Sequence, residues 1–260
     1  MNAARKTDPA DTTPRLSIVI PAYNESRRLG RTIEAVTAYL DQAYPEAELV
    51  IVDDGSRDET WSVIQAASAR DGRVVGRRLQ PNRGKGAAIR EGILAARGDY
   101  IIFFDADLPF GLENVDVFVE ALQQGNDVVI GARNLDPRRD EQHNPLTRRV
   151  ASLGFNAFVE LLLCLGIRDT QCGFKGFRGD VARAIVRHQT IDSFSFDVEL
   201  LFLAKRWQLT IKRIPLHHVH QAGSTVSVFK HSMLMLKGVL NVRRNALLSR
   251  YPQRMPAWED

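Results

Sequence analysis

The chain is poor in cysteine, with only Cys164 and Cys172 among its 260 residues. Two thiols form neither a disulfide framework nor the ligand spacing of a structural zinc site, so we expect a reduced, cytoplasmic protein. No stretch approaches the roughly 18–20 apolar residues that a membrane-spanning helix needs. Residues 1–15 are polar, contain two prolines and lack the apolar core of a signal peptide. We expect a disordered lead-in there.

Acidic residues are also missing from one long interval. Between Glu199 and Glu259 there is no Asp or Glu, whereas ten Lys and Arg and four of the six His lie there. Such a cationic surface suits phosphates, anionic lipid or nucleic acid. Nucleic acid is disfavoured as a partner, because Phe and Trp are not interleaved there as stacking platforms. His217, His218 and His220 lack a neighbouring Cys or acid, so phosphate contact or solvation is favoured there over a metal.

Strand and helix patterns alternate through the first half of the chain. The predicted strands are Leu16–Ile20, Leu49–Val52, Val74–Leu79, Tyr100–Phe104 and Val128–Ile130. The predicted helices are Glu25–Tyr44, Asp58–Arg70, Gly84–Arg97 and Leu112–Gln123. This alternation indicates an α/β fold with a mostly parallel sheet and helices on both faces. We expect one such domain over residues 16–228.

The second half is less regular. It predicts helices at Leu146–Leu165 and Phe196–Trp207, a loop at 166–175 and a short strand at Leu209–Ile214. A basic amphipathic helix is predicted over 229–251. One apolar stripe of that helix is flanked by basic residues and comprises Met233, Leu236, Leu240 and Leu247. The flanking basic residues are Lys230, Lys237, Arg243, Arg244 and Arg250.

Two interpretations of the last helix stay open. Basic residues beside an apolar stripe are typical of a helix in a membrane interface, which would make the protein peripherally membrane-associated. A second apolar stripe instead favours packing on the protein's own domain; it comprises Met235, Val239, Val242 and Ala246. Both interpretations hold if one stripe faces inward and the other faces lipid.

Two carboxylates follow the fourth predicted strand, one residue apart. In an extended chain the side chains of Asp105 and Asp107 lie on the same side. Like charges that converge repel each other unless a cation lies between them, and Mg²⁺ or Mn²⁺ with oxygen ligands is the natural candidate. The alternative is a solvated loop in which one Asp caps the next helix. Polar or charged residues also follow the first, second and fifth strands, and in a parallel sheet these ends share one ligand crevice.

Two further loops offer alternatives. Residues 82–86, NRGKG, do not match a P-loop, because the first glycine and the final Ser or Thr are missing. A glycine turn into a helix still favours an anion, with Lys85 as a charge, but a surface loop is the preferred interpretation. Asp53 and Asp54 suit either a strand-to-helix turn or hydrogen bonds to a ribose or a base.

The segments LSIVIPAYNE, VIVDDGSRDET, NRGKGAAIREGI, FFDADLP and VVIGAR resemble, in order and spacing, the family 2 glycosyltransferases of the GT-A fold. GIRDTQCGFKGF, SFSFDVELLFLAKR and HQAGSTVS, followed by a basic helix, closely resemble the dolichyl-phosphate β-glucosyltransferases and their polyprenyl-phosphate relatives. The resemblance covers nearly all of residues 16–251. It implies a UDP-sugar donor, a polyprenyl phosphate acceptor and Mg²⁺ or Mn²⁺ as cofactor.

The resemblance also implies roles for individual residues. Uridine is expected to be held by Pro21, Tyr23, Glu25 and Asp54, with Lys85 close to it. Asp105 is expected beside the ribose and the metal, Asp107 as the main protein ligand of the metal, and Arg133 at a phosphate near the acceptor. Related mannosyl-phosphate synthases commonly have Gln where this chain has Pro109, which favours glucose over mannose.

The expected reaction is a single displacement that inverts the anomeric carbon. A polyprenyl phosphate needs no general base, because its oxygen is already anionic, whereas a hydroxyl acceptor would need one. Asp197 and Glu199 cannot both face one site, and we predict that Asp197 faces the acceptor. The alternatives are a soluble family 2 enzyme with a hydroxyl acceptor and a mannosyl-phosphate synthase that uses GDP-mannose. A nucleotidyltransferase is disfavoured, because no Gly-rich triphosphate loop stands early in the chain.

Overall fold

A computed structural model describes residues 16–108, 110–133, 154, 157–163, 165–167, 169–216 and 228–256, with side chains from residue 235 onward in the last range. Several features predicted from the sequence lie outside the described residues. They are the lead-in, Pro109, Cys164, His217, His218 and His220, most of the predicted helix Leu146–Leu165, and the side chains of Lys230 and Met233.

The described residues form one seven-stranded sheet with the order β3-β2-β1-β4-β6-β5-β7. The strands are β1 Leu16–Ala22, β2 Glu48–Asp53, β3 Val74–Arg78, β4 Tyr100–Phe103, β5 Val128–Ala132, β6 Lys175–Arg178 and β7 Ile211–Pro215. Every neighbouring pair is parallel except those of β6, which runs antiparallel to both β4 and β5. The mostly parallel α/β sheet predicted from the sequence is therefore confirmed.

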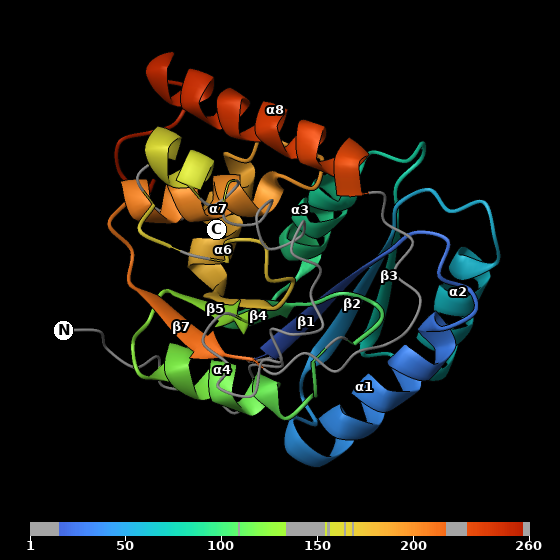
Figure 1. Ribbon diagram of the computed structural model, residues 1–260. Helices are drawn as coiled ribbons and strands as arrows, with labels where there is room; N and C mark the ends of the chain where they lie inside the picture. The colour runs from blue at the N-terminus through green and yellow to red at the C-terminus, as the bar shows by residue number, and fades with distance from the viewer. Residues whose placement is uncertain are drawn as a thin grey trace, which may run out of the picture.

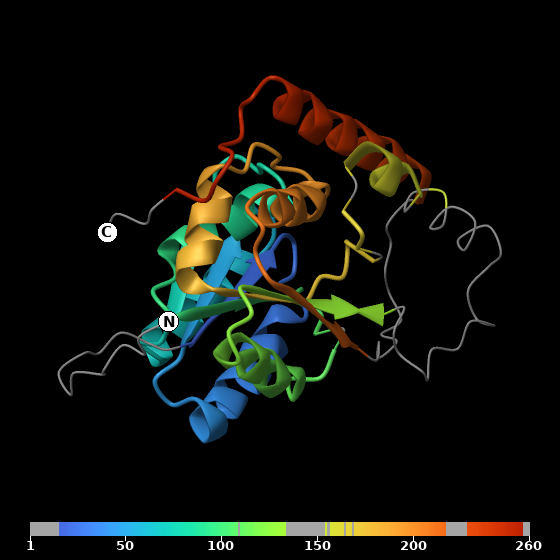
Figure 2. The ribbon, with the colours of Figure 1, turned by 90° about the vertical axis from the view of Figure 1, so that its left-hand side faces the viewer.

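Helices cover both faces of this sheet (Figure 1). The helices are α1 Leu29–Ala43, α2 Thr60–Arg70, α3 Lys85–Ala95, α4 Asn114–Gln123, α6 Gly179–Arg187, α7 Phe196–Arg206 and α8 Val228–Leu247. On one face lie α1, α2 and α4, and on the other lie α3, α6 and α7. Helix α8 packs on α7 as an outer layer, beside the helical stretch 157–163 (Figures 1 and 2).

The central strands are buried on both faces, and successive side chains enter different cores. Ile18 and Ile20 of β1 belong to the cluster formed with α1 and α4, whereas Val19 belongs to the cluster formed with α3, α6 and α7. Burying one such side chain stabilises the fold by about 1.5–3 kcal/mol. This explains why the central strands read as continuous apolar runs rather than as alternating ones.

Two elements, β6 and α6, are absent from the sequence prediction. Strand β6 has only four residues, of which two are charged and one is glycine, so it offers no apolar run. Its Lys175 is fully buried, which β-propensity does not anticipate. Helix α6 did carry a usable pattern, because its buried Val181 and Ala182 recur four residues later as Ile185 and Val186.

Helix α8 has an inner and an outer face. Val239 and Val242 of the second apolar stripe are buried, whereas Leu240 and Leu247 of the first stripe are 51% and 70% exposed. Within the described part of the chain, no helix combines the length and the apolar character needed to cross a membrane.

Candidate functional site

Loops that follow β1, β2 and β4 meet at one edge of the sheet and are tied together there. The backbone N–H of Asn24 donates to Ser56 Oγ at 2.9 Å, and the N–H of Arg57 donates to Asn24 Oδ1 at 2.9 Å. Thr32 Oγ1 donates to the carbonyl of Ala106 at 2.6 Å, which fixes the residue between the two carboxylates. The carboxyl ends of the parallel strands thus share one crevice, as expected for an open α/β sheet.

Asp105 and Asp107 lie in this crevice with different partners. Lys85 Nζ contacts Asp105 Oδ1 at 2.5 Å, whereas the nearest cation to Asp107 is the half-exposed Arg28, with 3.9 Å between Nη1 and Oδ2. The second oxygen of Asp107, Oδ1, is buried and has no hydrogen-bond partner among the described residues. Burial and the charge of Asp105 raise the pKa of Asp107 above its ordinary value, although Arg28 opposes this.

These features fit a divalent cation. A buried carboxylate oxygen without a partner, next to a second carboxylate, is costly until a cation or a donor reaches it. Among the described residues no cluster of three or more Asp, Glu, His or Cys side chains has metal-site spacing. Of the described residues, Asp105 and Asp107 are the ones that would hold the cation, and Mg²⁺ is usually bound through one or two carboxylates together with substrate oxygens and water.

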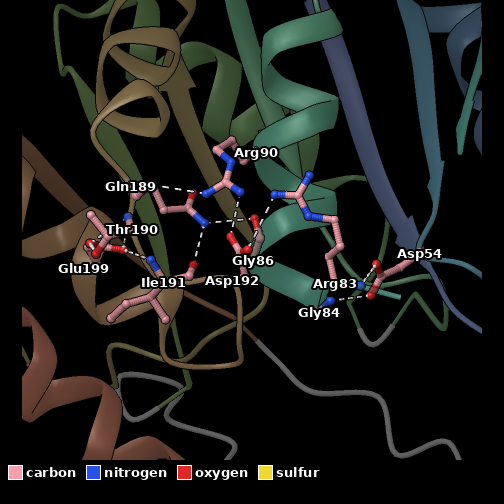
Figure 3. A network of polar contacts seen from close by, with 10 residues as sticks. All are labelled: Asp54, Arg83, Gly84, Gly86, Arg90, Gln189, Thr190, Ile191, Asp192 and Glu199. Atoms are coloured by element: carbon pink, nitrogen blue, oxygen red, sulfur yellow. Dashed lines mark hydrogen bonds and ion pairs between the residues drawn. The ribbon is translucent and has the colours of Figure 1, made fainter. Parts of the chain in front are cut away.

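Lys85 is held in place by the residues before and after it. Asp54 accepts hydrogen bonds from the side chain of Asn82 and from the N–H groups of Arg83 and Gly84, each at 2.8 Å (Figure 3). Its predicted contact with uridine stays a prediction, and its observed contacts shape the loop before Lys85. After Lys85, the N–H groups of Gly86 and Ala87 donate to the carbonyl of Asp192 at 2.8 and 3.3 Å. These two donors are therefore not free for an anion at the start of α3.

A second, buried ion pair lies behind Lys85. Lys175 Nζ contacts Asp197 Oδ1 at 2.5 Å and donates to the carbonyl of Cys172 at 2.6 Å. Burial raises the pKa of Asp197, whereas the charges of Lys175 and Lys85 oppose the rise. Asp197 thus stands between two cations, and its predicted action on the acceptor stays a prediction. Glu199 points elsewhere, to Thr190, Ile191 and Tyr251.

Arg133, expected at the acceptor phosphate, follows β5 and is paired with Asp169. The guanidinium Nη2 lies 2.5 Å from Asp169 Oδ1, and the backbone N–H of Arg133 donates to Oδ2 at 2.8 Å. The segment after Asp169 approaches the carboxylate pair, because a Cβ on Gly173 would stand 2.6 Å from Asp105 Oδ2. Only glycine fits there without moving Asp105.

Three non-glycine residues in these loops have a positive φ: Asn24 at 55°, Leu108 at 45° and Asp169 at 60°. For Leu108, directly after Asp107, this left-handed conformation has no local side-chain hydrogen bond to favour it. Such backbone strain typically costs about 1–3 kcal/mol and clusters at functional sites. Its presence in three loops of one crevice supports a binding function there.

The other residues predicted to hold the uridine of the sugar donor lie at the end of β1 and in the loop that follows it. Pro21 is half-buried on β1, Tyr23 is 42% exposed, and Glu25 pairs with Arg28, which also faces Asp107. Four residues of the site have no role in the sequence prediction; they are Arg28, Asp169, Gly173 and Lys175. The sequence contained one signal, and only for Lys175, which GFKGF places between two Gly–Phe pairs.

Comparisons with known proteins identify the family of the chain. Residues 17–186 match the family model for glycosyl transferase family 2. The chain is 32% identical to a dolichyl-phosphate β-glucosyltransferase of Dictyostelium discoideum over 90% of this chain and 75% of the relative. It is also 32% identical to the human enzyme of that name, over 89% of this chain and 75% of the relative.

Solved structures show the same fold. Glucosyl-3-phosphoglycerate synthase of Mycobacterium tuberculosis, crystallised with Mn²⁺, UDP and glucosyl-3-phosphoglycerate, has a TM-score of 0.61 and 19% identity, over 92% of this chain and 81% of that chain. The same enzyme with Mg²⁺ and UDP has a TM-score of 0.62 and 18% identity, over 92% of this chain and 80% of that chain.

Proposed function

Because the chain belongs to glycosyl transferase family 2, we propose that it transfers glucose from UDP-glucose to a polyprenyl phosphate such as dolichyl phosphate, with inversion. The observation that carries the proposal is the Asp105–Asp107 pair, with one oxygen of Asp107 buried and without a partner. Relatives named dolichyl-phosphate β-glucosyltransferase support the sugar and the acceptor. A structural neighbour that holds UDP and Mn²⁺ supports the nucleotide and the metal.

In this proposal the donor binds at the strand-end crevice. Pro21, Tyr23 and Glu25 would line the uridine. Asp54 Oδ1 accepts one hydrogen bond from the described residues, so it has room to accept a second one from the base. Asp105 and Asp107 would hold Mg²⁺ or Mn²⁺, which when bound neutralises charge that develops on the departing diphosphate. Lys85, which pairs with Asp105, would balance part of the charge of that carboxylate.

The acceptor would enter beside Arg133, whose side chain is 40% exposed. Asp169 holds the guanidinium through two oxygens, so Arg133 is oriented before an anion arrives. A phosphate monoester oxygen is anionic near neutral pH and attacks without a general base. The described residues therefore need only to bind and orient the phosphate, and Asp197 can act as the counter-ion of Lys175 and Lys85.

Helix α8 would bring the protein to its lipid as a peripheral, cytoplasmic partner of the membrane. Its outer face exposes Leu240 and Leu247 together with Lys237, Arg243 and Arg244. Leucines among cations are typical of helices that lie in an anionic interface. Each basic residue near such a surface contributes about 1 kcal/mol, and salt screens this attraction.

The test is a transfer assay with UDP-glucose and a polyprenyl phosphate in anionic liposomes, with Mn²⁺ or with EDTA. We expect a metal-dependent β-linked glucosyl phosphate product and competition by UDP rather than GDP. The triple variant Lys237→Glu, Arg243→Glu, Arg244→Glu should lose liposome binding and keep its affinity for UDP.

The matched control reverses three exposed charges outside α8, with Arg31→Glu in α1, Arg70→Glu in α2 and Arg77→Glu in β3, and should still bind liposomes. Figure 1 shows where these three elements lie relative to α8. Glucose transfer to water-soluble hydroxyl acceptors alone would contradict the proposed acceptor. If GDP competed as well as UDP, the uridine assignment would be wrong.

A further inference from the structure

We propose that Tyr251 and Glu199 are positioning residues for Lys85, acting through the loop 189–192. This makes the segment after α8 a working part of the donor site, and its effect on catalysis rests on the proposed function.

The first contacts in this series are made by Glu199. Glu199 lies in the first turn of α7 and is fully buried. Its carboxylate accepts the N–H and the hydroxyl of Thr190 at 2.9 and 2.6 Å and the N–H of Ile191 at 2.9 Å. A buried charge with this many donors fixes the backbone of the loop, since moving the loop would leave the carboxylate unsatisfied.

The C-terminal segment closes on the same carboxylate. Tyr251, 1% exposed, donates its hydroxyl to Glu199 Oε1 at 2.6 Å. From the end of α8, Asn245 donates to Thr190 Oγ1 at 2.9 Å. The carbonyl of Pro252 accepts hydrogen bonds from Arg206 and Trp207 of the α7 end at 3.0 and 3.1 Å. Residues 245–252 are thus anchored on the loop and on α7.

The loop 189–192 in turn packs against Gly84 and Gly86, the residues on either side of Lys85 (Figure 3). A Cβ on Gly84 would stand 2.5 Å from the carbonyl oxygen of Asp192, and a Cβ on Gly86 would stand 2.6 Å from that of Ile191. The Asp192 carbonyl accepts the Gly86 N–H at 2.8 Å, and Gln189 Nε2 donates to the Gly86 carbonyl at 2.9 Å. The glycines of NRGKG therefore allow this close approach, rather than the binding of a phosphate.

The same loop makes a second set of contacts with Arg90, one turn further along α3. Arg90 Nη2 contacts Asp192 Oδ1 at 2.6 Å, and Arg90 Nη1 donates to the carbonyl of Gln189 at 3.2 Å. The loop 189–192 thus fixes the first two turns of α3. Lys85 lies in this fixed segment, between Gly84 and Gly86, and its side chain contacts Asp105. A shift of that loop would change the charge balance at Asp105, where the metal is proposed to bind.

The experiment compares Tyr251→Phe with Tyr44→Phe. Both variants remove one hydroxyl that donates to a carboxylate retaining other donors, since Tyr44 donates to Asp116 at 2.7 Å and Tyr39 also binds Asp116. Asp116 lies in α4, on the other face of the sheet from α3. Three readouts are needed: calorimetric affinity for UDP with Mn²⁺, hydrogen exchange at the Gly86 and Ala87 amides, and the melting temperature.

We expect Tyr251→Phe to weaken UDP binding by about threefold to tenfold and to speed exchange at both amides, whereas Tyr44→Phe changes neither. The melting temperature should fall more in Tyr251→Phe than in Tyr44→Phe, because the hydrogen bond of Tyr251 is buried and that of Tyr44 is exposed. A lower melting temperature for Tyr251→Phe with unchanged UDP affinity and exchange would overturn the proposal. If the wild type binds no UDP, the proposed function fails, and the exchange data still decide whether Tyr251 reaches α3.

Discussion

The most informative single change is Asp107→Asn, because it should affect stability and binding in opposite directions. The substitution keeps the shape of the side chain and removes a charge that stands beside Asp105; among the described residues, the cation that pairs with it is Arg28, at 3.9 Å. Burial and Asp105 raise the pKa of Asp107 in the folded protein. The folded state therefore binds more protons than the unfolded state between the two pKa values, and stability falls as pH rises through that window.

At neutral pH the folded wild type carries the full free-energy cost of an ionised Asp107 beside Asp105, and the variant does not. Relief of one unfavourable charge commonly stabilises a protein by about 0.5–2 kcal/mol. For a chain of this size, 1 kcal/mol raises the melting temperature by roughly 2–4 °C. We therefore expect Asp107→Asn to melt a few degrees higher than the wild type without ligands, and this advantage should shrink as the pH is lowered toward 4.

Ligands should reverse the order. At 100 times its dissociation constant, a ligand that binds only the folded state stabilises it by about 2.7 kcal/mol. We expect Mn²⁺ with UDP to raise the melting temperature of the wild type well above that of the variant, and transfer activity to be lost in the variant. The assay is thermal unfolding at pH 7.5 and pH 5, with and without Mn²⁺ and UDP.

The control is Asp41→Asn, an Asp that is 61% exposed and pairs with Arg73 away from the crevice. It should change stability by less than about 0.5 kcal/mol and keep the full response to Mn²⁺ and UDP. The reasoning is refuted if Asp107→Asn is less stable than the wild type without ligands, or if it keeps the response to Mn²⁺ and UDP.

Three further predictions concern stability. Lys175→Met should destabilise the fold by about 3–5 kcal/mol in urea unfolding, because it removes the hydrogen-bonded partner of the buried Asp197, and adding Asp197→Leu should recover part of this; a cost below 1 kcal/mol would contradict a buried pair. Gly86→Ala should lower stability by about 1–3 kcal/mol, since its Cβ would lie 2.6 Å from a carbonyl oxygen, whereas Gly30→Ala, with 4.0 Å to its nearest neighbour, should not. Partial burial opposes ionisation of Asp58, but hydrogen bonds from Thr60 and Ser26 outweigh it and lower its pKa to about 2. The stabilisation that ionised Asp58 gives to the fold is therefore present above pH 4 and lost as pH falls toward 2. In acid unfolding, the difference in stability between wild type and Asp58→Asn should shrink over this range, and a constant difference would contradict the prediction.

The parts of the fold that follow from local pattern were predictable from the sequence. Strands β1, β2, β4 and β5 are apolar runs between turn residues, and each predicted strand begins or ends within two residues of the observed one. Their shared polar ends identified the crevice. Strand β6 could not be predicted, because its four residues are stabilised by pairing with β4 and β5, and that pairing is a tertiary contact.

The site was predictable as a location more than as a set of contacts. Asp105 and Asp107 stood out through their spacing, and the structure places both in the crevice beside Lys85. The contacts of Asp107 and of the turn around Lys85 were not predictable, since Arg28 and Asp192 come from distant segments of the chain. Asp197 and Glu199 illustrate this limit, because helical spacing separated them while only the fold shows that Asp197 pairs with Lys175 and Glu199 with Tyr251.

The antiparallel strand β6 has a consequence for the order in which the chain can fold. Strand β4, which leads into Asp105, pairs with β1 on one side and with β6 on the other, and β5 reaches the sheet through β6. While the ribosome has made only residues 1–170, β4 and β5 therefore both lack β6, and β5 also lacks its other neighbour, β7. An unpaired edge of this kind invites pairing with another chain. Fragments that end before Lys175 should therefore aggregate, and the carboxylate pair becomes part of an ordered crevice only late in synthesis.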